Sequence, residues 1–176
     1  KFYLPYLNEN MDVLDFGCGN GALAKIISQS VRSIEGLEVN DYPRSLAETK
    51  NNLKAYSSIQ DLSVSGKKFD AIISNHVLEH VDDDKASKEI YRVLIPKGIF
   101  IAMVPIIEGW EKTYEDKSIT SENNRSIHYG QGDHVRYYGR DFRQRIEKNG
   151  LKLTQELTAE GKEVIKYGLK RGEKVF

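Results

Sequence analysis

A glycine-rich turn and two carboxylates are the residues of this chain with the clearest chemical potential. The turn, Gly17-Cys18-Gly19-Asn20-Gly21-Ala22, follows an apolar segment at 12–16 and precedes a helix-like segment. Glycines at such a turn let the backbone bend sharply and let a ligand lie against the main chain at a helix N-terminus. Asp15 stands two residues before the turn, and Glu38 lies at the end of the next apolar segment. The pattern predicts a nucleoside-containing ligand at this turn.

Two cofactors fit the turn, and Asp15 separates them. The turn matches the dinucleotide fingerprint G-x-G-x-x-A, which indicates an NAD(P)-binding enzyme. A carboxylate at this position would repel a pyrophosphate, whereas it would attract a cofactor that carries an ammonium and a sulfonium but no phosphate, directly or through water. S-adenosylmethionine is such a cofactor. Glu38 would hold a ribose hydroxyl pair with either cofactor, and the structural alternative for Asp15 is a cap of the turn.

The histidines fall in two places, namely His76 and His80 after the apolar segment 69–74, and His128 and His134 in the stretch 105–138. Both places are expected to border the carboxyl ends of strands, where ligands bind in open α/β sheets. His76 and His134 are therefore our catalytic candidates, because one histidine could act as a general base.

Two other interpretations of these residues stay open. His76, Glu79, His80 and His134 could hold a divalent metal that orients the hydroxyls of an acceptor. Alternatively, Glu79 and His80 pair with loop backbone and hold the wall of the site. For His80 we favour this structural role, and we predict no metal.

Alternating apolar and helix-like segments must position these residues. Expected strands lie at 12–16, 33–39, 56–60, 69–74, 98–104 and 151–157, and expected helices begin after 21, at 41, at 82–84 (ending at 94, before Pro96) and at 141. This alternation predicts an α/β fold, a Rossmann-like open sheet with parallel strands. No periodicity is visible over residues 105–138, which predicts a loop or lid that covers a substrate.

Three residues near the end of that stretch are substrate candidates. Arg136, Tyr137 and Tyr138 combine a cation with aromatic hydroxyls and are predicted to bind an anionic or sugar-like acceptor. The alternative is that Val135 and Tyr137 pack while their neighbours face water.

The composition favours a single soluble cytoplasmic domain. The chain has 176 residues, 26 Lys plus Arg, 26 Asp plus Glu and one cysteine, Cys18. The balanced charge argues against a dedicated nucleic-acid binder, and a lone cysteine is typical of a reducing compartment. No apolar run approaches the roughly 18 residues of a membrane span. We expect a small-molecule substrate, no membrane association, and an oligomeric state that the sequence does not reveal.

The segment Val13–Gly21 resembles motif I of the class I S-adenosylmethionine-dependent methyltransferases. Residues 69–81, which end in Leu-Glu-His-Val, and residues 90–99 extend the resemblance over most of the chain, although Lys97 stands where many members have glycine. The resemblance implies helices on both faces of a mostly parallel sheet and an antiparallel C-terminal strand. It also implies one domain over residues 1–176, truncated at both ends, because members usually have a helix before the first strand.

The resemblance assigns cofactor roles by position. It places Asp15, Gly17, Cys18 and Gly19 around the methionine part and ribose, Glu38 at the ribose hydroxyls, Val39 against adenine, Asp61 at the adenine amino group with Leu62 nearby, and Asn75 along the cofactor. The structural alternative for Asp61 is a turn residue before Ser63.

The implied reaction is in-line attack of an acceptor atom on the sulfonium methyl, with release of S-adenosylhomocysteine. The expected acceptor is a small metabolite, quinone-like or sugar-like. Residues 74–77, Ser-Asn-His-Val, differ from the Asn-Pro-Pro-Tyr-like run expected for methylation of DNA amino groups. The alternatives are an NAD(P)-binding Rossmann enzyme and a non-catalytic S-adenosylmethionine-binding scaffold.

Overall fold

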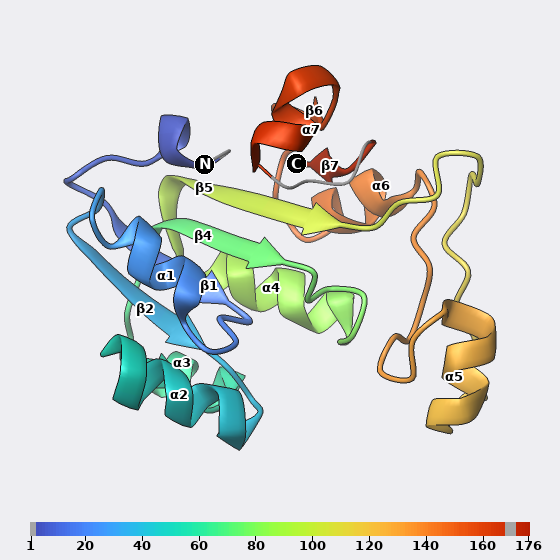
Figure 1. Ribbon diagram of the computed structural model, residues 1–176, viewed down its shortest axis with the longest axis horizontal. Coiled ribbons are helices and arrows are strands. Elements are labelled where there is room, and N and C mark those ends of the chain that lie inside the picture. The colour runs from blue at the N-terminus through green and yellow to red at the C-terminus, as the bar shows by residue number, and fades with distance from the viewer. Residues whose placement is uncertain (1–2, 168–171) are drawn as a thin grey trace. The chain divides into compact units, whose positions relative to one another are not determined.

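A computed structural model describes residues 3–167 and 172–176 of the chain (Figure 1). The chain divides into two compact units. The first comprises Lys1–Asn75 and Glu89–Ile101, and the second comprises His76–Lys88 and Ala102–Phe176. Within the described residues, no helix is both long and apolar enough to cross a membrane.

The first unit is built on parallel strands. These are β1 (Asp12–Phe16), β2 (Ser33–Leu37), β3 (Ala55–Tyr56) and β4 (Phe69–Asn75), followed by the first part of β5 (Leu94–Val104). β1 lies between β2 and β4, and its register places Asp15 beside Gly36 of β2 and Ile73 of β4. Val13, Leu14 and Ile72 are completely buried, as expected of central parallel strands that are covered on both faces.

Short helices connect these strands. They are η1 (Leu4–Tyr6), α1 (Ala22–Ile27), α2 (Asp41–Asn51), α3 (Ile59–Val64) and the end of α4 (Asp83–Val93). In Figure 1, α2 and α3 lie near the β3 end of the sheet, where both contact β3. The hydroxyl of Ser58 accepts a hydrogen bond from the Asp61 amide and so caps α3.

The second unit holds the C-terminal strands and the aromatic core. The end of β5 pairs antiparallel with β7 (Lys174–Val175), and β7 pairs antiparallel with β6 (Leu157–Thr158). The helices are the start of α4, α5 (Glu122–Tyr129), α6 (Phe142–Glu147) and α7 (Gly161–Tyr167). The ring centroid of Phe142 lies 4.8 Å from that of Tyr138 and 5.0 Å from that of Phe176.

The predicted fold class is confirmed. The strand order in the described part of the sheet is β3-β2-β1-β4-β5-β7-β6, mostly parallel with antiparallel C-terminal strands. Three expected strands were too long, and the one expected at 33–39 ends at Leu37. Residues 59–60 belong to α3 because Ser58 caps that helix, and in the segment 151–157 only Leu157 is in a strand.

Two other boundaries differ from the sequence-based expectation. The helix before Pro96 ends at Val93, and β5 already begins at Leu94 and includes the proline. The segment 105–138 contains α5, which Ser121 caps at its start and Gly130 ends with a φ of 77°. The sequence shows no helical periodicity here because the helix has few apolar residues. One of them, Ile127, is exposed, so the helix has no broad apolar face. A substrate-covering role for the segment stays a prediction.

The backbone conformation of Lys97 accounts for the glycine that many family members have at this position. Its φ of 68° lies in the left-handed region, which costs a residue with a Cβ about 1 kcal/mol. We expect Lys97→Gly to raise the free energy of unfolding by about 0.5 kcal/mol, because the larger entropy of an unfolded glycine offsets part of the gain. Urea unfolding measures this difference. Lys97→Ala, which keeps the Cβ, should give no gain, and a loss of stability in Lys97→Gly would contradict the strain.

Candidate functional site

The glycine turn of the first unit is tied to the end of β2. Gly17 and Gly19 have φ values of 82° and 54°, which favour glycine. The amides of Gly17 and Cys18 donate to the Leu37 carbonyl at 2.8 and 3.0 Å. A Cβ on Gly36 would lie 2.4 Å from the Cys18 Sγ, so the close packing of turn and strand also requires glycine there. Burial raises the pKa of the Cys18 thiol to about 12, which keeps it neutral.

Asp15 lies at the end of β1 as a buried carboxylate. Its side chain is 2% exposed, and Oδ2 has no hydrogen-bond partner among the described residues. Burial, with a contribution from the negative charge of Glu38, raises the pKa of Asp15 to about 7. A cap of the turn would satisfy this oxygen, so the arrangement fits better a carboxylate that receives a cationic ligand.

Glu38 connects the glycine turn to the residues after β2. Its Oε2 accepts from the Gly19 amide at 3.0 Å, and its Oε1 accepts from the Asn40 amide at 2.8 Å. These two bonds fix the carboxylate and leave lone pairs on both oxygens for further donors such as hydroxyls. Val39 is 60% exposed beside it and offers an apolar surface.

The remaining cofactor candidates are Asp61, Leu62 and Asn75, and each has a contact or a buried position within the protein. Asp61 is exposed, and the Ser57 hydroxyl donates to its carboxylate, which lowers the pKa of Asp61. Leu62 is completely buried, so its side chain belongs to the core and only its backbone is available to a ligand. The Asn75 Oδ1 accepts from the Tyr3 hydroxyl, a contact between residues 72 positions apart that no sequence pattern indicated.

His76 in the second unit is held between two carboxylates. Its Nδ1 lies 3.2 Å from Glu79 Oε1, and its Nε2 lies 3.0 Å from Glu173 Oε1. The Glu79 contact is the largest cause of a raised pKa, despite partial burial. Its backbone has a φ of 51°, and the residues after β4 form a turn. A cationic His76 would have no lone pair for a base.

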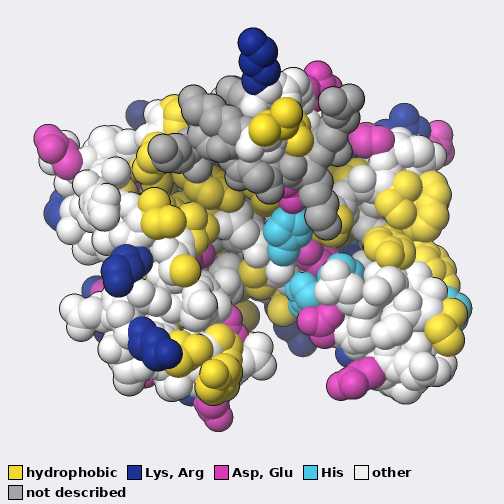
Figure 2. Space-filling model, in the orientation of Figure 1, with side chains coloured by type: hydrophobic (Ala, Val, Ile, Leu, Met, Phe, Trp, Pro, Cys, Tyr) yellow, Lys and Arg dark blue, Asp and Glu magenta, His cyan; other side chains and the backbone are white. Residues whose placement is uncertain are grey.

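His134 differs from His76 in that its surroundings lower its pKa. It is 5% exposed, burial and the neighbouring His80 lower its pKa, and its Nδ1 has no hydrogen-bond partner among the described residues. The His80 and His134 rings meet edge to face at 4.6 Å, and His80 Nδ1 lies 3.3 Å from the Asp133 carbonyl. Histidine side chains are visible beside acidic ones on the face shown in Figure 2. His134 is therefore the histidine with a neutral, buried imidazole.

Arg136 and Tyr138 have internal partners in place of the predicted acceptor. Arg136 is 6% exposed, and its Nη1 donates to the carbonyls of Leu78 at 2.7 Å and Val81 at 2.5 Å. The Tyr138 hydroxyl donates to Leu78 O and to Asp83. Burial forces this outcome, because a buried guanidinium or hydroxyl needs acceptors close by. Tyr137 is half-buried and stays a candidate for acceptor contact.

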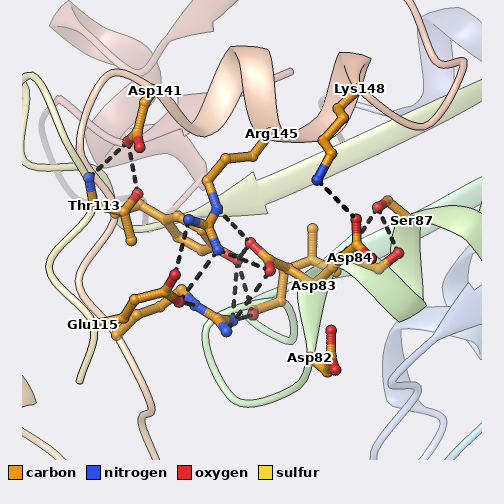
Figure 3. A network of polar contacts seen from close by, with 12 residues as sticks. Asp82, Asp83, Asp84, Ser87, Thr113, Glu115, Asp141, Arg145 and Lys148 are labelled. Carbon is orange, nitrogen blue, oxygen red and sulfur yellow. Dashed lines mark hydrogen bonds and ion pairs between the residues drawn. The ribbon is translucent and has the colours of Figure 1, made fainter. Parts of the chain in front are cut away.

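A network of two acids and two arginines surrounds these residues (Figure 3). Arg145 donates to Asp83 at 2.8 Å and to Glu115 at 3.0 Å, and Arg136 donates to the same Glu115 at 3.0 Å. Asp83 begins α4, Arg145 lies on α6 and Glu115 lies in the segment 105–138. The network therefore fastens that segment to two helices. Sequence reasoning missed Asp83, Glu115 and Arg145, because charges in a helix and a loop are usually solvated.

The chain belongs to a known family. A model described as "Methyltransferase domain" matches residues 1–156. Sterol 24-C-methyltransferase of Debaryomyces hansenii is 31% identical over 89% of this chain and 44% of that protein. The chloroplastic 2-phytyl-1,4-beta-naphthoquinone methyltransferase of Arabidopsis thaliana is 37% identical over 48% of this chain and 38% of that protein. The crystal structure of the YcgJ protein of Bacillus subtilis shares the fold, with a TM-score of 0.69, 22% identity, and coverage of 95% of this chain and 75% of that one.

These similarities define the chain as a class I S-adenosylmethionine-dependent methyltransferase domain. The chain spans about two fifths of the length of the curated relatives it matches. The donor of this family, S-adenosylmethionine, fits the first unit, because the unpartnered Asp15 oxygen suits a cation and the unused lone pairs of Glu38 suit hydroxyl groups. The dinucleotide interpretation is therefore not retained.

The buried network predicts a large cost for Arg136. We expect Arg136→Leu to lower the free energy of unfolding by roughly 3 kcal/mol, because it removes one donor each from Glu115 and from the Leu78 and Val81 carbonyls and leaves buried Asp83 and Glu115 with less positive charge beside them. Thermal unfolding and limited proteolysis of the segment 105–138 measure the effect. Arg140→Leu is the matched control, since its ion pair with Glu111 is 3.6 Å long and exposed. Equal losses in both variants would contradict the network's role.

Proposed function

We propose that this chain transfers a methyl group from S-adenosylmethionine to a small-molecule acceptor and releases S-adenosylhomocysteine. The observation that carries the proposal is the buried Asp15 carboxylate, unpartnered at Oδ2, directly before the glycine turn. The bound cofactor supplies an electrophilic methyl group on its sulfonium. Asp15 attracts its cationic end, Glu38 accepts from the ribose hydroxyls, and Val39 covers adenine.

In the proposed reaction the protein contributes positioning of the reactants. Transfer of a methyl group needs alignment of the acceptor atom with the sulfonium methyl and exclusion of water, and it needs no covalent intermediate with the protein. Gly17, Gly19 and Glu38 provide a preformed turn, since hydrogen bonds fix it without any ligand. Asp61 and Asn75 extend the predicted cofactor surface.

We infer an acceptor with an apolar ring system. The relatives named above act, by their names, on a sterol and on a naphthoquinone. The segment 105–138 carries an aromatic group that suits such a molecule, because the Trp110 ring lies 6.3 Å from both Tyr114 and Tyr137, and Trp110 and Tyr114 remain partly exposed. Tyr137, together with this group, is the predicted acceptor surface, and the segment is the predicted cover.

The pH dependence of ligand binding tests the role of Asp15. The ammonium group of S-adenosylhomocysteine pairs with ionised Asp15, so below the pKa of about 7 we expect affinity to fall by about tenfold per pH unit. Calorimetry from acid to slightly alkaline pH measures this. Asp15→Asn should bind at least about tenfold more weakly at pH 8 and lose the pH dependence. Asp12→Asn, which changes a half-buried carboxylate at the other end of the same strand, should bind S-adenosylhomocysteine like the unmodified chain.

The raised pKa of Asp15 also determines how the stability of the fold changes with pH. Because folding raises the pKa of Asp15 above its ordinary value of 3.8, the protonated form contributes stability that is complete below about pH 4 and is lost as the pH rises towards 7. Asp15→Asn should therefore become more stable than the unmodified chain across this window. Constant relative stability, or a pH-independent affinity of the unmodified chain, would contradict the buried carboxylate.

An acceptor panel tests turnover. We expect release of S-adenosylhomocysteine with polycyclic or isoprenoid phenols and sterols, and little release with nucleic acid. The Asp15→Asn variant should be inactive at limiting cofactor. Binding of S-adenosylhomocysteine without release for any acceptor would favour a non-catalytic scaffold. Tight binding of NAD without binding of S-adenosylhomocysteine would overturn the proposal.

A further inference from the structure

Three side chains of the second unit converge without forming a closed hydrogen-bond network. Glu79, His80 and His134 each offer one ligand atom, and these atoms all lie within 4.8 Å of one another. Glu79 and His80 lie in the turn that follows β4, whereas His134 comes from the end of the segment 105–138. Two distant parts of the chain thus bring two imidazoles and one carboxylate together.

Two of the three residues leave a buried polar atom without a partner. Glu79 is 1% exposed and its Oε2 has no hydrogen bond to the described residues, and the same holds for Nδ1 of His134, which is 5% exposed. An unsatisfied buried polar atom costs about 1–3 kcal/mol, and more when it is charged. Such atoms in a cluster of possible metal ligands point to a partner that the protein itself does not supply.

The other atoms of the same side chains are already held. Glu79 Oε1 faces His76 Nδ1 at 3.2 Å, and His80 Nδ1 lies 3.3 Å from the Asp133 carbonyl and 3.4 Å from its carboxylate. Metal-binding histidines and carboxylates usually have such outer partners, which fix the ring and leave the second atom for the ion. For His80 that second atom is Nε2.

The link between the turn after β4 and the segment 105–138 does not require the Glu79 carboxylate. The main chain already joins the two segments here, because the Val135 amide donates to the Glu79 carbonyl at 3.0 Å. An apolar side chain at position 79 would keep this bond and avoid burying a charge. The buried Glu79 oxygen and the buried His134 nitrogen without partners among the described residues are therefore better explained by a ligand.

We propose that Glu79, His80 and His134 bind one divalent transition-metal ion of the Zn²⁺ type. Two imidazole nitrogens and one carboxylate oxygen are typical ligands of Zn²⁺, Co²⁺ and Fe²⁺, whereas Mg²⁺ and Ca²⁺ prefer oxygen alone. His76 is an outer partner and not a ligand, since both its nitrogens face carboxylates. This set differs from the four-residue alternative considered from sequence by the loss of that one histidine.

The site leaves room for a further ligand. Three protein ligands leave at least one coordination position open. His80, one of the three, also lines a cavity of about 540 Å³ in this unit. This part of the inference rests on the proposed function: the open position would take a hydroxyl or carboxylate oxygen of the acceptor, so the acceptor class becomes an oxygen-bearing ring compound.

Metal titration of the chelator-treated chain tests the site. Calorimetry with Zn²⁺ should show one equivalent bound, and Co²⁺ should give the visible absorption of a tetrahedral site. Glu79→Gln keeps the shape and should weaken Zn²⁺ binding at least about tenfold. His80→Asn provides a second variant at a partly exposed position. His128→Asn is the matched control, because it changes a histidine of the same unit outside the cluster and should bind Zn²⁺ normally.

The outcomes separate this inference from the proposed function. Absence of Zn²⁺ binding, or unchanged binding in both Glu79→Gln and His80→Asn, overturns the metal site, and so does an equal loss in His128→Asn. S-adenosylhomocysteine titrated into the same samples reports on the first unit independently. Zn²⁺ should also raise the melting temperature of the unmodified chain and of His128→Asn. Glu79→Gln should show a cooperative melting transition, which demonstrates that it is folded, and Zn²⁺ should leave its melting temperature unchanged.

Discussion

The rest of the first unit depends on one constraint, the tight fastening of the glycine turn to the end of β2. The amides of Gly17 and Cys18 share the Leu37 carbonyl, and the Gly19 amide binds the Glu38 carboxylate. These bonds fix the turn without any ligand. Beside it, Asp15 is buried, and its Oδ2 has no hydrogen-bond partner among the described residues. The proposed cofactor site rests on both properties.

The second unit contains two kinds of buried polar side chain, those with hydrogen-bond partners and those with an unpartnered atom among the described residues. Around Arg136, the acids Asp83 and Glu115 and several carbonyls neutralise and satisfy the guanidinium groups. Replacing one member leaves the others unpaired, which is why such networks fix a single geometry even where their net contribution to stability is small. Around Glu79 and His134, by contrast, the chain leaves polar atoms unused. This contrast distinguishes residues that hold the segment 105–138 from residues that are available to a ligand.

Unsatisfied buried groups thus mark the same property in both units. Asp15, Glu79 and His134 each have one buried polar side-chain atom with no hydrogen-bond partner among the described residues. Each carries a cost that a folded chain avoids elsewhere, because most buried polar groups find partners. The proposed cationic cofactor would pair with Asp15, and the proposed metal ion would pair with Glu79 and His134.

The sequence by itself determined the features that depend on neighbouring residues. The apolar strand, the glycine turn and the acidic residues at the strand ends are local, so they indicated the sheet, the Asp15 and Glu38 positions and the family. Only the tertiary structure decided which side chains are buried and paired. Leu62 is in the core, Arg136 and Tyr138 bind the chain itself, and His76 meets Glu173 across 97 residues. Periodicity describes one segment at a time, whereas burial and partner choice follow from segments that meet only after folding.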